Sequence, residues 1–161
     1  MPTPPLPPAG PEAQLAAPGH PPDKLSVLVL SGLFERVHYA LVMASAAAAI
    51  GMPATLFFTD QALRALLAGE PEGAPGWRML PSADSRPGGA VDDERRERGI
   101  AGFEELLGAC GELGVRMIVC EMGLRAIGLE AAALRADLPI EVAGVVTFLA
   151  DASATGALLS L

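Results

Sequence analysis

Positive charge, aromatic side chains and cysteine are all scarce in this 161-residue chain. Eleven Lys and Arg residues stand against nineteen Asp and Glu residues, which gives a formal net charge of −8. Nucleic acids and anionic membranes bind proteins through clusters of Lys and Arg. The charge balance therefore argues against both as partners. Two cysteines and two histidines are too few for a disulfide framework and form no zinc-ligand pattern, so we expect no metal.

Long apolar runs are also missing, although 51% of the residues are hydrophobic and the mean hydropathy is +0.39. The longest run, residues 40–50, is shorter than the roughly 20 residues that a membrane-spanning helix needs. No basic segment precedes an apolar one near the first residue, as a signal peptide requires. We therefore expect a cytoplasmic protein with no membrane span, whose apolar residues fill a core or a subunit interface.

Proline divides the chain into segments. Residues 1–23 hold nine of the fifteen prolines, which predicts a disordered tail. Residues 24–161 then form the predicted domain, interrupted by a long loop at 69–98 that contains four prolines and five glycines. Within this loop, the charged run 92–98 is typical of the start of a solvated helix. Loops of this length are usually lids or disordered segments.

The domain alternates between strand and helix patterns. Short apolar runs predict strands at 25–30, 54–58, 115–120, 140–142 and 157–161. Helical spacing predicts helices at 33–50, with Ser31 as the N-cap, and near 100–114, 130–136 and 145–152, together with a short helix that Asp60 caps. Repeated strand–helix units of this kind predict an α/β fold with an open, mainly parallel sheet of about five strands and helices on both faces.

Ligands of open α/β sheets bind beyond the carboxyl ends of the strands. Three such ends can be identified, and a histidine on the first helix could approach them. The ligand-pocket candidates are therefore Ser31, Gly32, His38, Thr59, Glu121, Met122 and Gly123. For His38, a place in the core or an interface is the simpler interpretation. Residues 31–36 lack the further glycines of a dinucleotide loop, and the chain has no G-x-S-x-G elbow, so we expect no nucleotide cofactor and no serine hydrolase.

The third strand end also carries a nucleophile, Cys120. Backbone N–H groups at a turn that opens a helix stabilise a thiolate and make the cysteine reactive. The alternative is a small buried side chain, as free cysteines often are. Cys110 shares a helical stripe with Phe103 and Leu107, which favours core packing. The spacing between the two cysteines does not match the C-x-x-C motif of dithiol redox proteins.

Five motifs, taken in chain order, resemble those of the DsrE/DsrF-like sulfur-relay family, which includes the TusD-type sulfur carriers. They are the Ala-Ile-Gly-Met of 49–52, the Phe-Phe-Thr of 57–59, the Val-Cys-Glu-Met of 119–122, the Ile-Gly-Leu of 127–129 and the Gly-x-x-Thr-Phe-Leu of 144–149. Gly123 and Leu124 stand where a hydroxyl residue and a methionine are common in the branch that the chain most resembles.

The resemblance implies a flavodoxin-like fold and a homo-oligomer, either a trimer or a multiple of one. It also implies that Cys120 carries sulfur as a persulfide between donor and acceptor proteins. Such a carrier needs one exposed, reactive cysteine. Two other functions stay open from the residues: a non-catalytic oligomeric binding or assembly subunit with a buried Cys120, and a redox sensor in which Cys120 is oxidised.

Overall fold

The computed structural model describes residues 19–69 and 73–161. Most of the predicted tail at 1–23 therefore lies outside the described residues. The centre of the fold is a five-stranded sheet in the order β4-β3-β2-β1-β5, in which every neighbouring pair is parallel. Its strands are β1 (Leu25–Val29), β2 (Ala54–Phe58), β3 (Arg116–Cys120), β4 (Ile140–Ala143) and β5 (Ala157–Ser160). The predicted α/β fold is confirmed.

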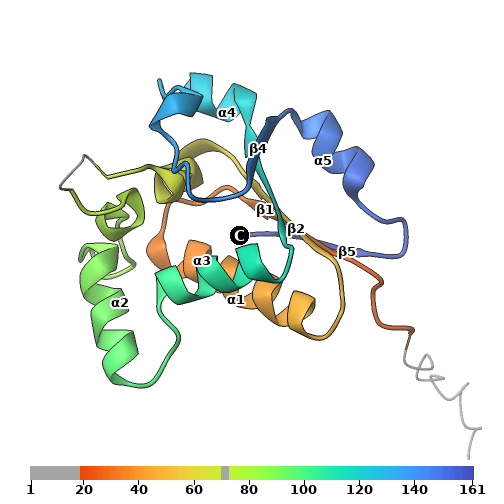
Figure 1. The fold of residues 1–161 in the computed structure, drawn as a ribbon, viewed down its shortest axis with the longest axis horizontal. Helices are drawn as coiled ribbons and strands as arrows, with labels where there is room; N and C mark the ends of the chain where they lie inside the picture. Colours follow the sequence, from red (N-terminus) through yellow and green to blue (C-terminus); the bar gives the residue numbers. More distant parts are fainter. Residues whose placement is uncertain (1–18, 70–72) are drawn as a thin grey trace, which may run out of the picture.

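Helices connect the strands and cover the sheet (Figure 1). The α-helices are α1 (Phe34–Ala49), α2 (Gly88–Glu97), α3 (Phe103–Glu112), α4 (Glu121–Ala126) and α5 (Val145–Asp151). Short 3₁₀ helices lie in the connections: η1 (Asp60–Leu66), η2 (Gly76–Met79) and η3 (Ala131–Ala133). In the part of the chain that the structure describes, no helix is long and apolar enough to cross a membrane.

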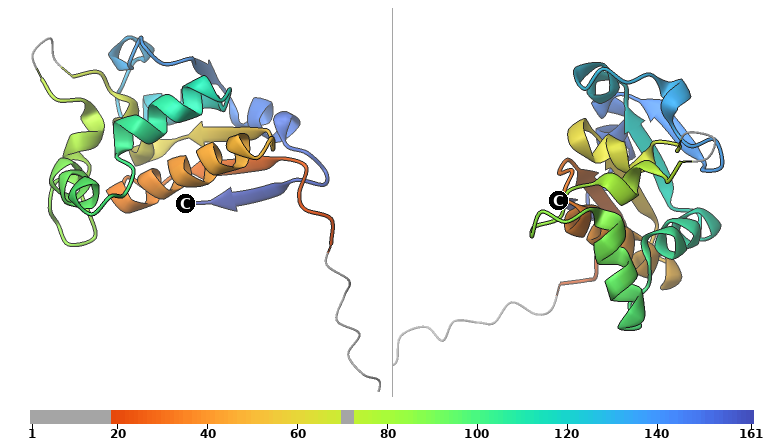
Figure 2. Two further views of the ribbon diagram at one scale, coloured as in Figure 1. Left: turned by 60° about the horizontal axis from the view of Figure 1, so that its bottom comes forward. Right: turned by 90° about the vertical axis from the view of Figure 1, so that its left-hand side faces the viewer.

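The two faces of the sheet bury hydrophobic clusters of very different size. Side chains alternate along a strand, so Val27, Leu56 and Met117 face one side, where they join the large core beneath α1 and α3. Figure 2 shows α1 and α3 running side by side along this face, with α5 on the opposite side of the sheet. The intervening residues Phe57 and Ile118 face α5 in a much smaller cluster.

The winding of the chain brings three strand ends together. From β1 the chain adds β2, β3 and β4 on one side, and β5 then returns to the other side of β1. Because the strands are parallel and in register, Val29 lies opposite Phe58, which in turn lies opposite Val119. The segments that follow β1, β2 and β3 therefore leave the sheet at the same edge.

The start of α1 differs from the prediction. Ser31 is not its N-cap, because α1 begins at Phe34 and the N-cap position falls on Leu33, which supplies no side-chain cap. The Ser31 hydroxyl oxygen instead accepts the Leu33 N–H at 3.2 Å. The Phe34 N–H donates to the carbonyl oxygen of Pro81 at 2.9 Å. A distant segment thus provides the partner that a local side chain was expected to supply.

The segment 69–98 is not one long loop, because it contains η2 and α2. Trp77 of η2 is buried and stacks on Phe103 with ring centroids 4.7 Å apart. Gly88 packs so closely on Phe34 that a Cβ at this position would lie 2.7 Å from the ring. The prolines and glycines thus allow close packing against α1 and α3, which their local sequence pattern does not indicate. The helix predicted at 130–136 is likewise reduced to η3.

Asp92 of α2 fastens the start of α3. Its side chain is buried with 2% exposure, and one carboxylate oxygen accepts the Phe103 N–H at 2.8 Å. The first N–H groups of a helix have no partner within the helix, and a buried N–H without a partner is costly. Asp92 therefore caps α3 from a different helix.

We expect Asp92→Ala to lower the free energy of unfolding by about 1–3 kcal/mol, because it leaves the Phe103 N–H buried without a partner. Chemical denaturation measures this change. The neighbouring Asp93→Ala is the matched control, since Asp93 forms a surface ion pair with Arg78 that contributes little. Equal effects of the two substitutions would contradict the capping role.

Candidate functional site

Cys120 is the last residue of β3 and the N-cap of α4. Its Sγ accepts the Gly123 N–H at 3.3 Å. This places the sulfur where an oxygen side chain stands in an ordinary N-capped helix. A backbone N–H that points at sulfur stabilises negative charge there.

Gly123 allows α4 to lie against the end of β2. A Cβ at position 123 would lie 2.6 Å from the Thr59 hydroxyl oxygen and 3.0 Å from the Asp60 backbone nitrogen. Only glycine therefore fits without displacing this backbone. The predicted candidates Thr59, Gly123 and Cys120 thus come together at the shared strand edge.

The sulfur of this site is covered. Cys120 is only 2% exposed and belongs to the small cluster with Phe57, Ile118 and Phe148. The exposed cysteine that a carrier needs is therefore absent from this conformation. Position along β3 explains the burial, because Cys120 follows Ile118 by two residues and points to the face that α5 covers.

Two of the other candidates lie beside this site and face solvent. Met122 is 70% exposed, and the Glu121 carboxylate pairs with Arg125 one turn further along α4. These two residues therefore form the outer surface of the first turn of α4.

Ser31 and Gly32 line a separate pocket of about 220 Å³. Its remaining lining residues come from the start of α1, from η1 and from the segment after η2: Leu33, Gln61, Arg64, Leu80 and Pro81. Cys120 does not line this pocket. The structure therefore divides the predicted ligand-pocket candidates between two neighbouring places at the strand edge.

His38 belongs to neither place. It lies on α1, whereas Cys120 points to the opposite face of the sheet. Its Nε2 lies 2.9 Å from the Ala101 carbonyl oxygen, and its Nδ1 lies 3.2 Å from Nη1 of Arg95. Because a carbonyl only accepts and a guanidinium only donates, the ring is neutral with its proton on Nε2. Burial lowers the pKa of His38, which agrees with this state. His38 is therefore a buried packing residue, and it does not line the pocket beside Ser31 and Gly32.

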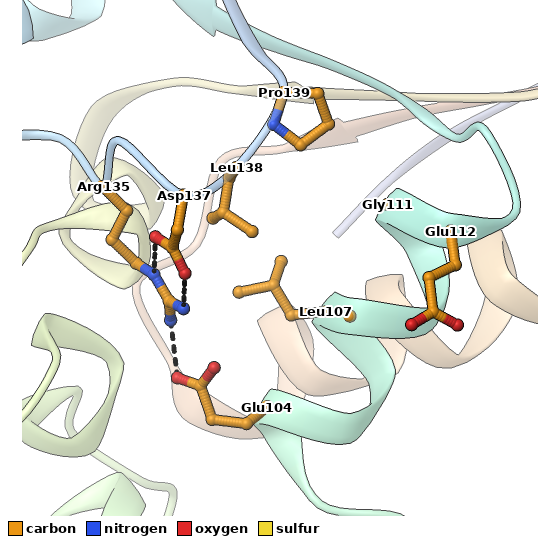
Figure 3. A pocket seen from close by; sticks show the side chains of 9 residues that line it. Glu104, Leu107, Gly111, Glu112, Arg135, Asp137, Leu138 and Pro139 are labelled. Atoms are coloured by element: carbon orange, nitrogen blue, oxygen red, sulfur yellow. Dashed lines mark hydrogen bonds and ion pairs between the residues drawn. The ribbon is translucent and has the colours of Figure 1, made fainter.

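A larger pocket of about 390 Å³ lies between α3 and the segment that leads to β4 (Figure 3). Arg135 extends across one end of it and pairs with Asp137 and Glu104. The guanidinium is thus already occupied by two carboxylates, and neither cysteine lines the pocket. Within residues 19–69 and 73–161, no three His, Cys, Asp or Glu side chains lie close enough together to hold a metal ion.

Sequence reasoning did not assign a role to Phe148 and Asp151 of α5. Phe148 stacks on Phe57 beside Cys120, and Asp151 binds side chains from three other segments. Phe148 occurs in the Thr-Phe-Leu motif, which was the available signal. Its position over the sheet depends on where the crossover from β4 to β5 runs.

Together, the open parallel sheet and the cysteine at a strand end define an α/β protein of flavodoxin-like architecture. Residues 34–159 match the DsrE/DsrF-like family, and the chain belongs to this family.

The chain is 29% identical to the sulfur carrier protein DsrE2 of Allochromatium vinosum over 118 residues, which cover 62% of this chain and 74% of that protein. The structure of the present chain is similar to the crystal structure of the ychN protein from E. coli, with a TM-score of 0.50 and 14% identity. That alignment covers 86% of this chain and 99% of the other, and it supports the fold.

The two cysteines should differ in reactivity. Burial beneath α1 raises the pKa of Cys110 to about 11, so about one part in ten thousand is thiolate at pH 7. We expect iodoacetamide to alkylate Cys120 at least about tenfold faster than Cys110 in the folded protein at this pH. Mass spectrometry of peptides over time measures both rates. Equal or reversed rates would contradict the assignment of Cys120 as the nucleophile.

Proposed function

We propose that this protein is a sulfur carrier that holds sulfane sulfur as a persulfide on Cys120. Membership of the DsrE/DsrF-like family and the likeness to a protein named as a sulfur carrier support this role. The single observation that carries it to a residue is the Gly123 N–H donated to the Cys120 sulfur. In the rest of the described chain, the other cysteine is Cys110, whose thiol donates to the Leu41 carbonyl oxygen at 3.6 Å and whose pKa is raised by burial to about 11.

The transfer is a displacement at sulfur. The Cys120 thiolate attacks the outer sulfur of a donor persulfide, R–S–SH, and a new S–S bond forms as the donor's S–S bond breaks. The donor leaves as a thiolate with the bonding electron pair and takes a proton from solvent, while Cys120 becomes Cys120–S–SH. A thiolate of an acceptor protein then attacks the outer sulfur in the same way and releases Cys120. No net oxidation or reduction takes place.

The residues around the sulfur have two tasks in this reaction. The Gly123 N–H stabilises the sulfur anion that attacks and later leaves. The apolar side chains of Phe57, Ile118 and Phe148 keep water from the bound persulfide. The partners are therefore a sulfur donor and a sulfur acceptor, and the proposed compartment is the cytoplasm, where thiols stay reduced.

A non-catalytic binding or assembly subunit is the second candidate function. The observation that favours it is the burial of the Cys120 sulfur, since an inert cysteine is usually buried. In that case the pocket beside Ser31 and Gly32 would hold the ligand. The two functions differ in whether Cys120 accepts sulfur.

Self-association is part of the proposal. Exposed apolar side chains lie on α5 and, by the alternation of side chains along β1 and β5, on the same face of the sheet after β1 and in β5. This apolar surface consists of Leu30, Val145, Val146, Leu149 and Leu158. Exposed apolar patches of this kind mark interfaces between proteins. We propose that a second copy of the chain covers it, in a trimer or a multiple of a trimer.

Incubation with a low-molecular-weight persulfide should add one sulfur atom to the protein, because Cys120 provides the attacking thiolate. Intact-mass spectrometry detects the addition. Cys120→Ser should abolish it, and Cys110→Ser, the matched control, should leave it unchanged. Sulfur uptake that survives in Cys120→Ser would overturn the proposed site, and no uptake by the native protein would favour the binding subunit.

Light scattering at micromolar concentration should give the mass of three chains or a multiple of three. Val146→Asp should lower this mass, because it places a charge in the apolar surface that the second copy would bury. Leu113→Asp is the control, since Leu113 is an exposed leucine at the end of α3 and lies outside that surface. A monomeric native protein would contradict self-association, and an equal effect of both variants would contradict the proposed surface.

A further inference from the structure

One side chain anchors α5 to the sheet. Phe148 is the buried residue of this helix, and its ring stacks on Phe57 with centroids 4.8 Å apart and an angle of 21° between the planes. Two other side chains of α5 face solvent, because Val146 is 76% exposed and Leu149 is 58% exposed. A seven-residue helix with a single buried side chain has little apolar contact to hold it in place.

A second attachment lies at the last residue of α5. One Asp151 carboxylate oxygen accepts from Lys24 Nζ at 2.7 Å and from the Thr55 hydroxyl at 2.6 Å, and the other accepts from Arg116 Nη1 at 2.8 Å. Burial raises the pKa of Asp151, but the hydrogen bonds from Lys24, Thr55 and Arg116 outweigh it and hold the pKa at about 2. Asp151 is therefore ionised at neutral pH and joins α5 to three segments of the sheet.

The attachments of α5 and the sulfur share one cluster. Phe148, Phe57 and Cys120 pack in the same small group of buried residues, on the face of the sheet that α5 covers. Gly144 precedes α5, and a Cβ at that position would have open space around it. No heavy atom would lie within 4 Å of that Cβ, whereas the far end of α5 is held by the charged partners of Asp151. Displacing α5 would uncover the cluster without disturbing the large core beneath α1 and α3.

We propose that α5 is a lid over Cys120, with Asp151 as its latch, and that Cys120 reacts only when the lid opens. This inference rests on the proposed function for its biological meaning, because a sulfur carrier with a covered sulfur needs a means of uncovering it. The lid itself is a property of the fold and can be tested without sulfur transfer. Opening separates Phe148 from Phe57 and Asp151 from Lys24 and Arg116, while the strands stay paired.

Alkylation of the full chain with iodoacetamide tests the lid, with Cys110 as an internal reporter. Asp151→Asn removes the charge that holds Lys24 and Arg116, so the open form becomes more populated. We expect Cys120 to be alkylated about tenfold faster in Asp151→Asn than in the native protein, with the rate at Cys110 unchanged. Asp93→Asn, the same change in a surface ion pair of α2, should alter neither rate.

Lid opening, unfolding of the whole domain and lost self-association predict different labelling of the two cysteines in single and double variants. Unchanged labelling of Cys120 in Asp151→Asn would overturn the lid. Equal acceleration at Cys110 would also overturn it, because that result reports unfolding of the whole domain. Because α5 also carries Val145, Val146 and Leu149 of the proposed self-association surface, the same comparison is made in the Val146→Asp background, where self-association is already weakened. Equal labelling of Cys120 with and without Asp151→Asn in that background would assign the exposure to lost self-association and overturn the lid. If Cys120 labels faster but no variant accepts sulfur, then the lid stands and the sulfur-carrier function falls.

Discussion

The alternation of side chains along β3 is the constraint on which the site depends. Met117 and Val119 point into the large core beneath α1 and α3, so Ile118 and Cys120 must point to the other face of the sheet. A shift of one residue would place the sulfur under α1, where Cys110 already lies without access to solvent. The pairing of β3 with both β2 and β4 holds this register.

At the edge of the sheet beyond β3, α4 packs closely against the segment that follows β2. Because Gly123 has no side chain, the first turn of α4 can lie against Thr59 and Asp60. The same turn directs the Gly123 N–H at the Cys120 sulfur. The conformation of the chain after β2 and the environment of the cysteine are therefore linked through a residue that contributes only its backbone.

The two faces of the sheet differ in the interactions that hold the helices against them. On the α1 and α3 side, aromatic rings from three segments pack together: Phe34 from α1, Trp77 from η2 and Phe103 from α3. On the other side, α5 is held by one ring stack and by the ionised Asp151. On the first face, many apolar contacts share the stabilisation of the helices. On the second face, the attachment of α5 depends on a few residues. The strongly packed face supports the fold, and the weakly packed face carries Cys120.

The sequence by itself determined the parallel α/β fold, the five strands to within a residue or two and the place of Cys120 at a strand end, because these follow from local patterns of apolar residues. It also separated Cys110, on a helical stripe, from Cys120. Tertiary structure alone decided that η2 and the start of α2 form ahead of the charged run 92–98, that His38 is neutral with its proton on Nε2 and that the sulfur of Cys120 is covered. Each of these depends on partners far along the chain, such as Pro81 for Phe34, Ala101 for His38 and Phe148 for the cysteine cluster. Local spacing carries no information about such partners, since they meet only when the crossover to β5 and the packing of α2 are complete.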